Sequence, residues 1–135
     1  MRPLRTLARC VLAWVFLRAG YDVVTNPAKP ATTAGPFLAE MRQRLPVKLP
    51  EDTVIVRANA AFQMGAAGLF AAGVAPRVVA CGLVASLLPT TLAGHQFWKV
   101  EDAALRPNQR NHFNKNMAIA AGLVLYVLGD RRRSS

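Results

Sequence analysis

The chain has 135 residues, 53% of them hydrophobic, with a net charge of +10 and a mean hydropathy of +0.22. This length fits one domain and excludes a catalytic domain of ordinary size joined to a separate membrane anchor. The basic residues are spread over both ends and every expected loop, with few aromatic residues among them, so they form no nucleic-acid-binding surface. Anionic lipid headgroups are the simpler partner for this charge.

The apolar residues are concentrated in four segments, at about 4–24, 54–74, 78–98 and 112–128. A helix needs about 20 apolar residues, and at least roughly 17, to cross the hydrocarbon core of a bilayer. The first two segments meet this length, and the last two reach it when flanking residues are included. His95, Trp98 and His112 would then lie at the membrane interface, which favours amphipathic rings. The sequence predicts an all-α fold, an integral membrane four-helix bundle in a single domain, 1–135.

A soluble four-helix bundle is the alternative, and it should show a charged face on every helix. No charged residue occurs in 58–76 or in 78–94, which argues against it. A cleaved signal peptide is a second alternative, because Arg2, Arg5 and Arg9 precede an apolar run. Arg18 interrupts that run and no small-residue cleavage site follows it, so we expect a retained helix.

The first loop begins with Asn26-Pro27, and its further glycine and proline residues, Pro30, Gly35 and Pro36, favour turns. After them, apolar residues recur at helical spacing, namely Phe37, Leu38, Met41 and Leu45, while Glu40, Arg42 and Arg44 face away. This spacing predicts a short interfacial helix on the outer surface. A solvated loop with one helical turn is the alternative.

Four spans place both termini on one side of the membrane. That side carries its basic residues in short segments almost free of acidic residues: Arg2, Arg5, Arg9, Arg77, Arg131, Arg132 and Arg133. Positive charge close to the ends of spans favours the cytoplasmic side. We therefore expect both termini in the cytoplasm.

Small residues on the second segment are expected to let a neighbouring helix approach its backbone closely. They lie on two faces, one with Ala61, Gly65, Leu69 and Gly73 and the other with Gly68 and Ala72. The two cysteines, Cys10 and Cys81, lie in apolar segments and are interpreted as small packing residues. A redox pair is the alternative, although no neighbouring base marks either thiol as reactive.

Polar side chains lie near the outer ends of all four segments and are expected to gather at one face of the membrane. Such residues are costly in lipid and are candidates for a functional site. Arg18 and Asp22, four residues apart, can pair on one helix. The surplus positive charge and the imidazole suit an anion, a quinone head or a thiol-derived oxyanion. The alternative is anchoring of helix ends at the interface. The candidate ligand-binding residues are Arg18, Asp22, Arg57, Asn59, His95, Trp98, Lys115 and Asn116.

Metal binding is not indicated by the sequence. His95 and His112 are the only two histidines, and no spacing of histidine and cysteine matches a zinc or haem site. No phosphate-binding glycine loop or nucleophile motif occurs either. No catalytic residue is therefore assigned from the sequence.

Four stretches carry a resemblance to a known family: Arg18-Ala19-Gly20, Val56-Arg57-Ala58-Asn59, the run 89–98 (PTTLAGHQFW) and the run 112–119 (HFNKNMAI). They resemble the DoxX family of small bacterial membrane proteins with four helices. The resemblance implies an inner-membrane location and a link to quinone-coupled thiosulfate oxidation or to complexes that guard thiol redox balance. It implies a subunit or partner of a redox system rather than an enzyme by itself, with quinone as the possible cofactor. A permease for small solutes or lipids and a purely structural membrane subunit remain as alternatives.

Overall fold

The computed structural model describes residues 2–129, in which the regular secondary structure is entirely helical, with no strand. The five α-helices are α1 (Arg2–Thr25), α2 (Ala28–Arg44), α3 (Asp52–Ala72), α4 (Pro76–Gly94) and α5 (Arg106–Gly129), and a 3₁₀ turn, η1 (Phe97–Lys99), follows α4. The all-α prediction is confirmed. The basic run Arg131, Arg132 and Arg133, used above to orient the chain, lies outside the described residues.

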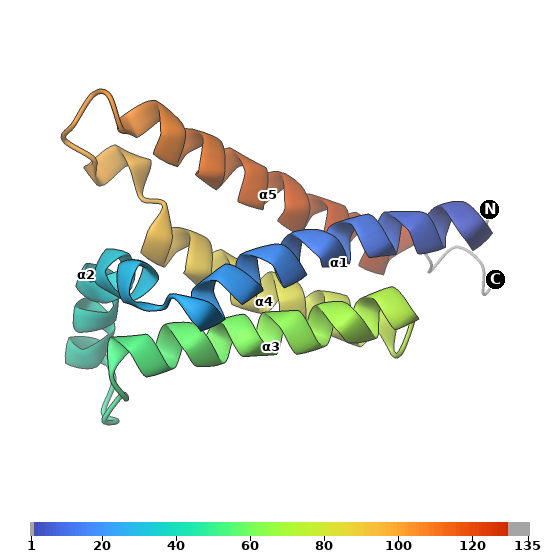
Figure 1. The fold of residues 1–135 in the computed structure, drawn as a ribbon, viewed down its shortest axis with the longest axis horizontal. Helices are drawn as coiled ribbons and strands as arrows, with labels where there is room; N and C mark the ends of the chain where they lie inside the picture. Colours follow the sequence, from blue (N-terminus) through green and yellow to red (C-terminus); the bar gives the residue numbers. More distant parts are fainter. Residues whose placement is uncertain (1, 130–135) are drawn as a thin grey trace.

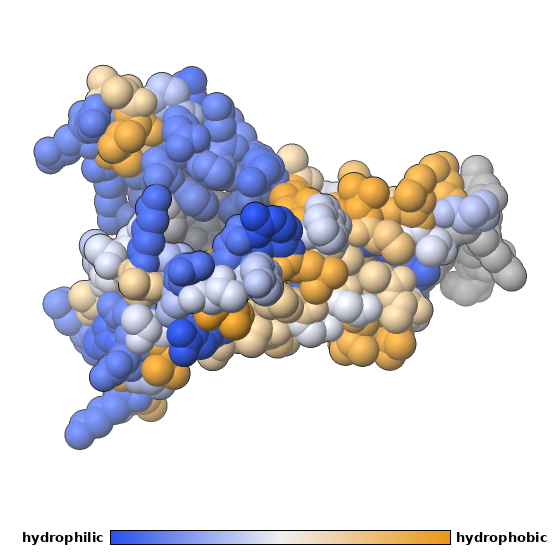
Figure 2. Space-filling model, in the orientation of Figure 1, coloured by the Kyte–Doolittle hydropathy of each residue, from blue (hydrophilic) through white to orange (hydrophobic). Residues whose placement is uncertain are grey.

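The long helices α1, α3, α4 and α5 run along the length of the molecule, and α2 lies across one end (Figure 1). The start of α1, the turn between α3 and α4, and the end of α5 share the other end, which we call the terminal end. The end with α2, η1 and the start of α5 is called the loop end. Figure 2 shows apolar side chains over the terminal half of the surface and hydrophilic ones over the loop end.

The residues at which the helices end and begin explain the connections between them. Asn26 and Pro27 separate α1 from α2, as expected. Gly73 ends α3 in the left-handed region, with φ of 80°, where a residue without a Cβ is favoured. Pro76 then opens α4 at a position where its missing N–H costs nothing. The turn between α3 and α4 is therefore short and defined by its sequence.

The first loop differs from the prediction. Turns were expected through Pro30 and Pro36, with only a short helix after them, but α2 starts at Ala28 and has 17 residues. Pro30 lies in the first helical turn, where proline is tolerated, and Pro36 lies inside the helix at the cost of one backbone hydrogen bond. Burial of Ala31, Ala34 and Leu38 against the bundle stabilises α2 despite its prolines.

The hydrophobic core lies toward the terminal end and draws on all four long helices. The edge-to-face pair of Phe70 and Tyr126, with ring centroids 5.1 Å apart, joins α3 to α5 there. Toward the loop end α5 diverges from α1 and keeps its contacts with α4 and η1 (Figure 1). The buried core residues are Ala13, Phe16, Ala66, Ala67, Phe70, Ala80, Leu83, Leu87, Ala120 and Leu123.

By length and composition, two helical segments within residues 2–129 could cross a membrane: Asp52–Ala72 and Pro76–Lys99. The other two long helices are less apolar, because Arg5, Arg9, Arg18 and Asp22 interrupt α1 and the polar run 106–116 opens α5. The third expected span, 78–98, is not one continuous helix. It ends at Gly94 and resumes as η1 at Phe97.

The expected face of small residues on α3 is not the face that packs closely. A Cβ added at Gly65 or Gly68 would meet no atom within 4 Å, and Ala61 and Leu69 are exposed. The close approach is made instead from α1, where a Cβ on Gly20 would meet the Met64 side chain. Spacing of small residues along α3 could not reveal which face α1 would use.

Candidate functional site

A closed set of hydrogen bonds joins α3 to α4 inside the bundle. The Asn59 amide Nδ2 donates to Thr90 Oγ1 at 2.8 Å, and Ser86 Oγ donates to Asn59 Oδ1 at 2.6 Å. Gln63 Nε2 donates to Ser86 Oγ at 3.0 Å, and the Thr90 hydroxyl donates to the backbone carbonyl of Ser86 at 2.7 Å. We call these four residues the amide–hydroxyl network.

The network follows from matched spacing on two antiparallel helices. Asn59 and Gln63 are one turn apart on α3, and Ser86 and Thr90 are one turn apart on α4, so each amide meets a hydroxyl. Hydrogen bonds of this kind hold helices together where apolar surroundings supply no competing water. The network therefore fixes the register of α3 on α4. Both amide atoms of Asn59 form hydrogen bonds to side chains of α4, so Asn59 has a structural role.

Thr91 makes the equivalent link on the other side of α4. The Asn116 amide Nδ2 on α5 donates to Thr91 Oγ1 at 3.1 Å, and the Thr91 hydroxyl donates to the carbonyl of Leu87 at 2.8 Å. Consecutive threonines of the Pro-Thr-Thr sequence thus face α3 and α5 respectively. Asn116, like Asn59, holds a neighbouring helix against α4.

Two histidines come together where α4 ends. His95 caps the helix, and its Nδ1 lies 2.7 Å from Oε1 of Gln109 on α5. Its ring stacks on His112, with centroids 5.0 Å apart and planes inclined by 14°. Within the described chain, His95 Nε2 and both ring nitrogens of His112 have no hydrogen-bond partner. We call His95 and His112 the imidazole pair; it offers free ring nitrogens to a ligand.

An aromatic cluster follows directly in η1. Phe97, Trp98 and Phe113 contact one another edge to face, with centroid distances of 5.2 Å, 5.5 Å and 5.6 Å. Trp98 is half exposed. The cluster lies next in sequence to both histidines, since Phe97 follows His95 by two residues and Phe113 follows His112 directly. It can supply a flat apolar wall for a ring-shaped ligand.

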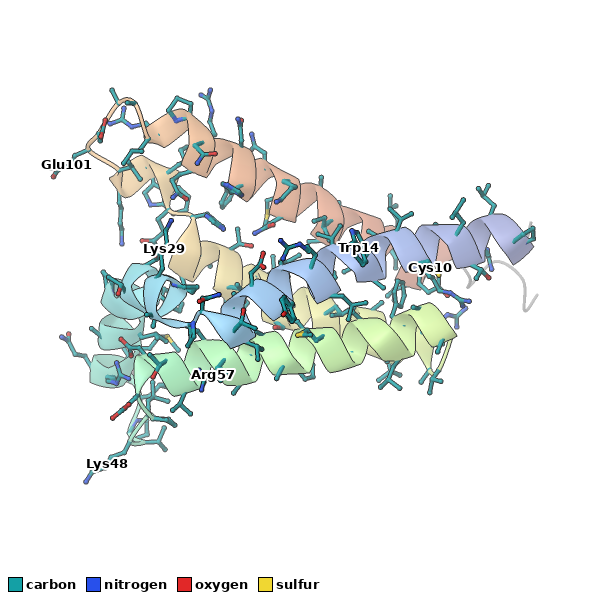
Figure 3. All side chains as sticks on the ribbon, viewed as in Figure 1. Cys10, Trp14, Lys29, Lys48, Arg57 and Glu101 are labelled. Carbon is teal, nitrogen blue, oxygen red and sulfur yellow. The ribbon has the colours of Figure 1, made fainter. Side chains whose placement is uncertain are left out.

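The charged candidates are not gathered with these groups. Arg18 and Asp22 form the expected ion pair through Nη1 and Oδ1. Both side chains are 58% exposed, so the pair lies on the surface of the bundle and Asp22 is not buried beside Arg18. Arg57 is exposed on α3, across the bundle from α5 (Figure 3), and Lys115 is exposed on α5. Helix rotation turns these four side chains outward.

The family model for DoxX matches residues 4–96. The chain belongs to the DoxX family. The resemblance noted in the sequence is thereby confirmed, and with the apolar α3 and α4 it identifies the chain as a DoxX membrane protein. Comparison with curated proteins and with solved structures gave no match.

The match covers α1 to α4 and ends after His95, so η1 and α5 lie beyond it. In this DoxX protein α5 nevertheless supplies Gln109, His112 and Phe113 to the groups around His95. The site at the loop end therefore combines a family-matched residue with partners that the family model does not reach.

Several residues of the site were not among the sequence candidates. Gln63, Ser86, Thr90 and Thr91 are neutral polar residues in apolar segments, and the repeated four-residue spacing on α3 and α4 is the signal that could have revealed them. Gln109 was missed because the fourth span was expected to begin at residue 112, whereas α5 begins at Arg106.

Among residues 2–129 no three His, Cys, Asp or Glu side chains converge as metal ligands would. Cys10 and Cys81 are both exposed and unpaired by a disulfide. The groups that the DoxX protein brings together are thus imidazole, amide and aromatic, which suit hydrogen bonding and ring stacking.

Proposed function

We propose that this DoxX protein is a non-catalytic subunit or partner of a membrane redox system, and that its loop end binds the head of a quinone. The observation that carries the proposal is the imidazole pair, with free ring nitrogens, beside the aromatic cluster. A quinone head presents two carbonyl acceptors on a flat ring, so it needs both a hydrogen-bond donor and an apolar wall.

In the proposed arrangement α1, α3, α4 and α5 cross a bacterial inner membrane as one domain, with both termini in the cytoplasm. The shared core supports one domain, because α1, α3, α4 and α5 all contribute to it. The polar loop end and the more apolar terminal half support a loop end that lies outside the hydrocarbon core (Figure 2), and with the termini in the cytoplasm this end faces outward. Helix α2 would lie at the outer interface, with its two arginines, Arg42 and Arg44, in the last turn.

The candidate residues take different roles in this proposal. His95, oriented by Gln109, would contact a quinone carbonyl and exchange a proton with it, and Trp98 would flank the ring. Asn59 and Asn116 position the helices that carry the site. The exposed cations, Arg18, Arg57 and Lys115, would add positive potential at the outer surface, and Asp22 would orient Arg18.

The test is a fluorescence titration of the detergent-solubilised protein with a short-chain benzoquinone. A Trp14→Phe background leaves Trp98 as the single tryptophan, because the chain has two. We expect saturable quenching in this background and a loss of affinity of about fivefold or more in His95→Asn, since one hydrogen bond is worth about 1 kcal/mol. Non-saturable quenching, or the same affinity in His95→Asn, would reject a quinone site at the imidazole pair.

Two arginine variants test whether Arg57 contributes to quinone binding through the electrostatic potential of the loop end. Arg57→Gln removes an exposed cation of the loop end, and Arg44→Gln makes the same change on α2. We expect a small effect of Arg57→Gln that disappears at high salt, because exposed charges are screened. Equal effects of the two variants would remove Arg57 from the site.

A structural subunit without chemistry is the second candidate. It is favoured by the outward exposure of Arg18, Asp22, Arg57 and Lys115, because side chains of this kind commonly anchor helices at the interface. Under this function the aromatic and imidazole groups would pack η1 on α5 and bind nothing. Absence of saturable quinone binding, together with destabilisation by His95→Asn, would support it.

A further inference from the structure

A cavity of about 300 Å³ lies between α1 and α5 at the terminal end, far along the bundle from the imidazole pair. This volume is at the lower end of the range of small-molecule pockets. Its walls are mostly apolar and come from Leu12 on α1 and from Gly122, Leu125 and Tyr126 on α5. Two arginines of α1, Arg5 and Arg9, also line it. The cavity thus combines an apolar interior with cationic groups near the start of α1.

Arg9 has donors that the described chain does not satisfy. Its guanidinium lies over the α3–α4 turn, so that a Cβ on Gly73 would be 3.0 Å from Nη1. Nε is buried without a hydrogen-bond partner, and Nη2 reaches only the Thr6 hydroxyl, at 3.4 Å. A guanidinium carries five N–H donors, and leaving a buried one unpaired is unfavourable. Because Nε is enclosed and Gly73 does not line the cavity, an oxyanion there would supply an acceptor once the Arg9 side chain turns from Gly73 toward the cavity that it also lines.

The apolar walls and the arginines of the cavity together suit one class of ligand. A free phosphate would use the arginines but gain nothing from the apolar walls, and a neutral lipid would use the walls but not the arginines. A phospholipid with an anionic headgroup uses both. Basic pockets between membrane helices near the interface are suited to such headgroups. By sequence, three further arginines, 131–133, follow Gly129, which also lines the cavity.

We propose that this cavity is a binding site for an anionic phospholipid. The lipid phosphate accepts hydrogen bonds from Arg9 and faces the charge of Arg5, while one acyl chain lies along Leu12 and Leu125. Bound lipid fills the space between α1 and α5, which share the core through Phe16 and Leu123 but leave this cavity between them. The site is independent of quinone binding at the loop end.

The test is native mass spectrometry of the detergent-solubilised full chain with phosphatidylglycerol, with phosphatidylcholine, and with glycerol phosphate, which has no acyl chain. We expect one retained phosphatidylglycerol and weak retention of phosphatidylcholine. Arg5→Gln/Arg9→Gln should weaken retention about tenfold or more, because each basic residue near an anionic lipid contributes about 1 kcal/mol. Lys99→Gln/Arg110→Gln, with the same loss of charge at the loop end, is the control.

A second pair of variants tests the acyl chain without changing charge. A Cβ at Gly122 meets no atom within 4 Å, so Gly122→Leu should fold and fill the cavity, and Gly65→Leu makes the same change at an equally open position on α3. We expect lipid loss in Gly122→Leu and retention in Gly65→Leu. Equal retention of both lipids, or unchanged retention in Gly122→Leu, would overturn the proposal. Competition by glycerol phosphate as strong as by phosphatidylglycerol would also overturn it, in favour of a free phosphate site.

Discussion

Gln109 on α5 holds His95 at the end of α4, with His95 Nδ1 2.7 Å from Gln109 Oε1. The contact joins two helices across the 3₁₀ turn and sets which ring nitrogen of His95 stays open. A carbonyl acceptor on Nδ1 fixes Nδ1 as a proton-bearing nitrogen and leaves Nε2 for a ligand. Nε2 donates to a quinone carbonyl when the ring is protonated, and accepts from a quinol hydroxyl when the ring is neutral. The side chain of Gln109 thus orients the group on which the proposed quinone site depends.

Replacing Gln109 should weaken quinone binding without removing a group that touches the ligand. In Gln109→Leu the His95 ring loses its orienting partner, and we expect the dissociation constant to rise about threefold to tenfold, since a hydrogen bond is worth about 0.5–1.5 kcal/mol. The measurement is the Trp98 titration in the Trp14→Phe background. Gln43→Leu, on the exposed surface of α2, is the matched control. An unchanged affinity in Gln109→Leu would show that His95 needs no orientation.

Removing one member of the amide–hydroxyl network should destabilise the protein, because its partners are left without hydrogen bonds. Ser86→Ala removes the acceptor of Gln63 and the donor to Asn59, and we expect a loss of about 1–3 kcal/mol in the free energy of unfolding. Thr33→Ala removes a hydroxyl bonded only to the carbonyl of Lys29 within α2, and should change stability by less than about 0.5 kcal/mol.

A double-mutant cycle of Gln63→Leu and Ser86→Ala, followed by denaturant unfolding in detergent, isolates their interaction. We expect a coupling of about 0.5–2 kcal/mol, the range of interhelical hydrogen bonds in membrane proteins and of contacting pairs. Additive losses would mean that the two side chains do not interact, and the register of α3 on α4 would then need another explanation.

The four long helices could be predicted from the sequence because each contains a mainly apolar run too long for a strand, although charges interrupt the run of α1. The length of α2 could not, because Pro30 and Pro36 favour turns locally and only burial of Ala31, Ala34 and Leu38 offsets that preference. Likewise the start of α5 at Arg106 lies in a polar stretch, where hydropathy gives no helix signal.

The candidate site was predictable in its location along the helices but not in its orientation. The sequence placed Arg18, Arg57, His95 and Lys115 near the same ends of their helices. Which of them face inward depends on the rotation of each helix about its axis, and helices that are apolar all round give no preferred rotation. His95 turns inward to Gln109, while Arg18, Arg57 and Lys115 turn outward.

Gly20 should not accept a larger residue, in contrast to an open glycine on α3. A Cβ at Gly20 would meet the Met64 side chain and lie 3.1 Å from the carbonyl oxygen of Ala60, so Gly20→Val should destabilise the fold by about 1–3 kcal/mol through overpacking. Gly65→Ala meets nothing within 4 Å and should be neutral or raise stability by about 0.5–1 kcal/mol, because alanine favours the helix. Thermal unfolding of both variants in detergent tests the opposite signs. A harmless Gly20→Val would show that α1 and α3 are not in close contact there.

The exposed ion pairs of α1 and α2 should contribute equally little to the free energy of unfolding. Arg18–Asp22 and Glu40–Arg44 are both four-residue pairs, with exposures of 58% and 58% in the first, and of 50% for Glu40 and 73% for Arg44 in the second. Because exposed pairs contribute about 0.2–1 kcal/mol, Asp22→Ala and Glu40→Ala should each reduce the free energy of unfolding by no more than that. Denaturant unfolding of both variants in detergent at low and high salt is the measurement, and salt should diminish both effects. A loss of several kcal/mol in Asp22→Ala alone would mean that a partner or lipid shields this pair from water in the folded protein, since only an ion pair removed from water is so costly to break.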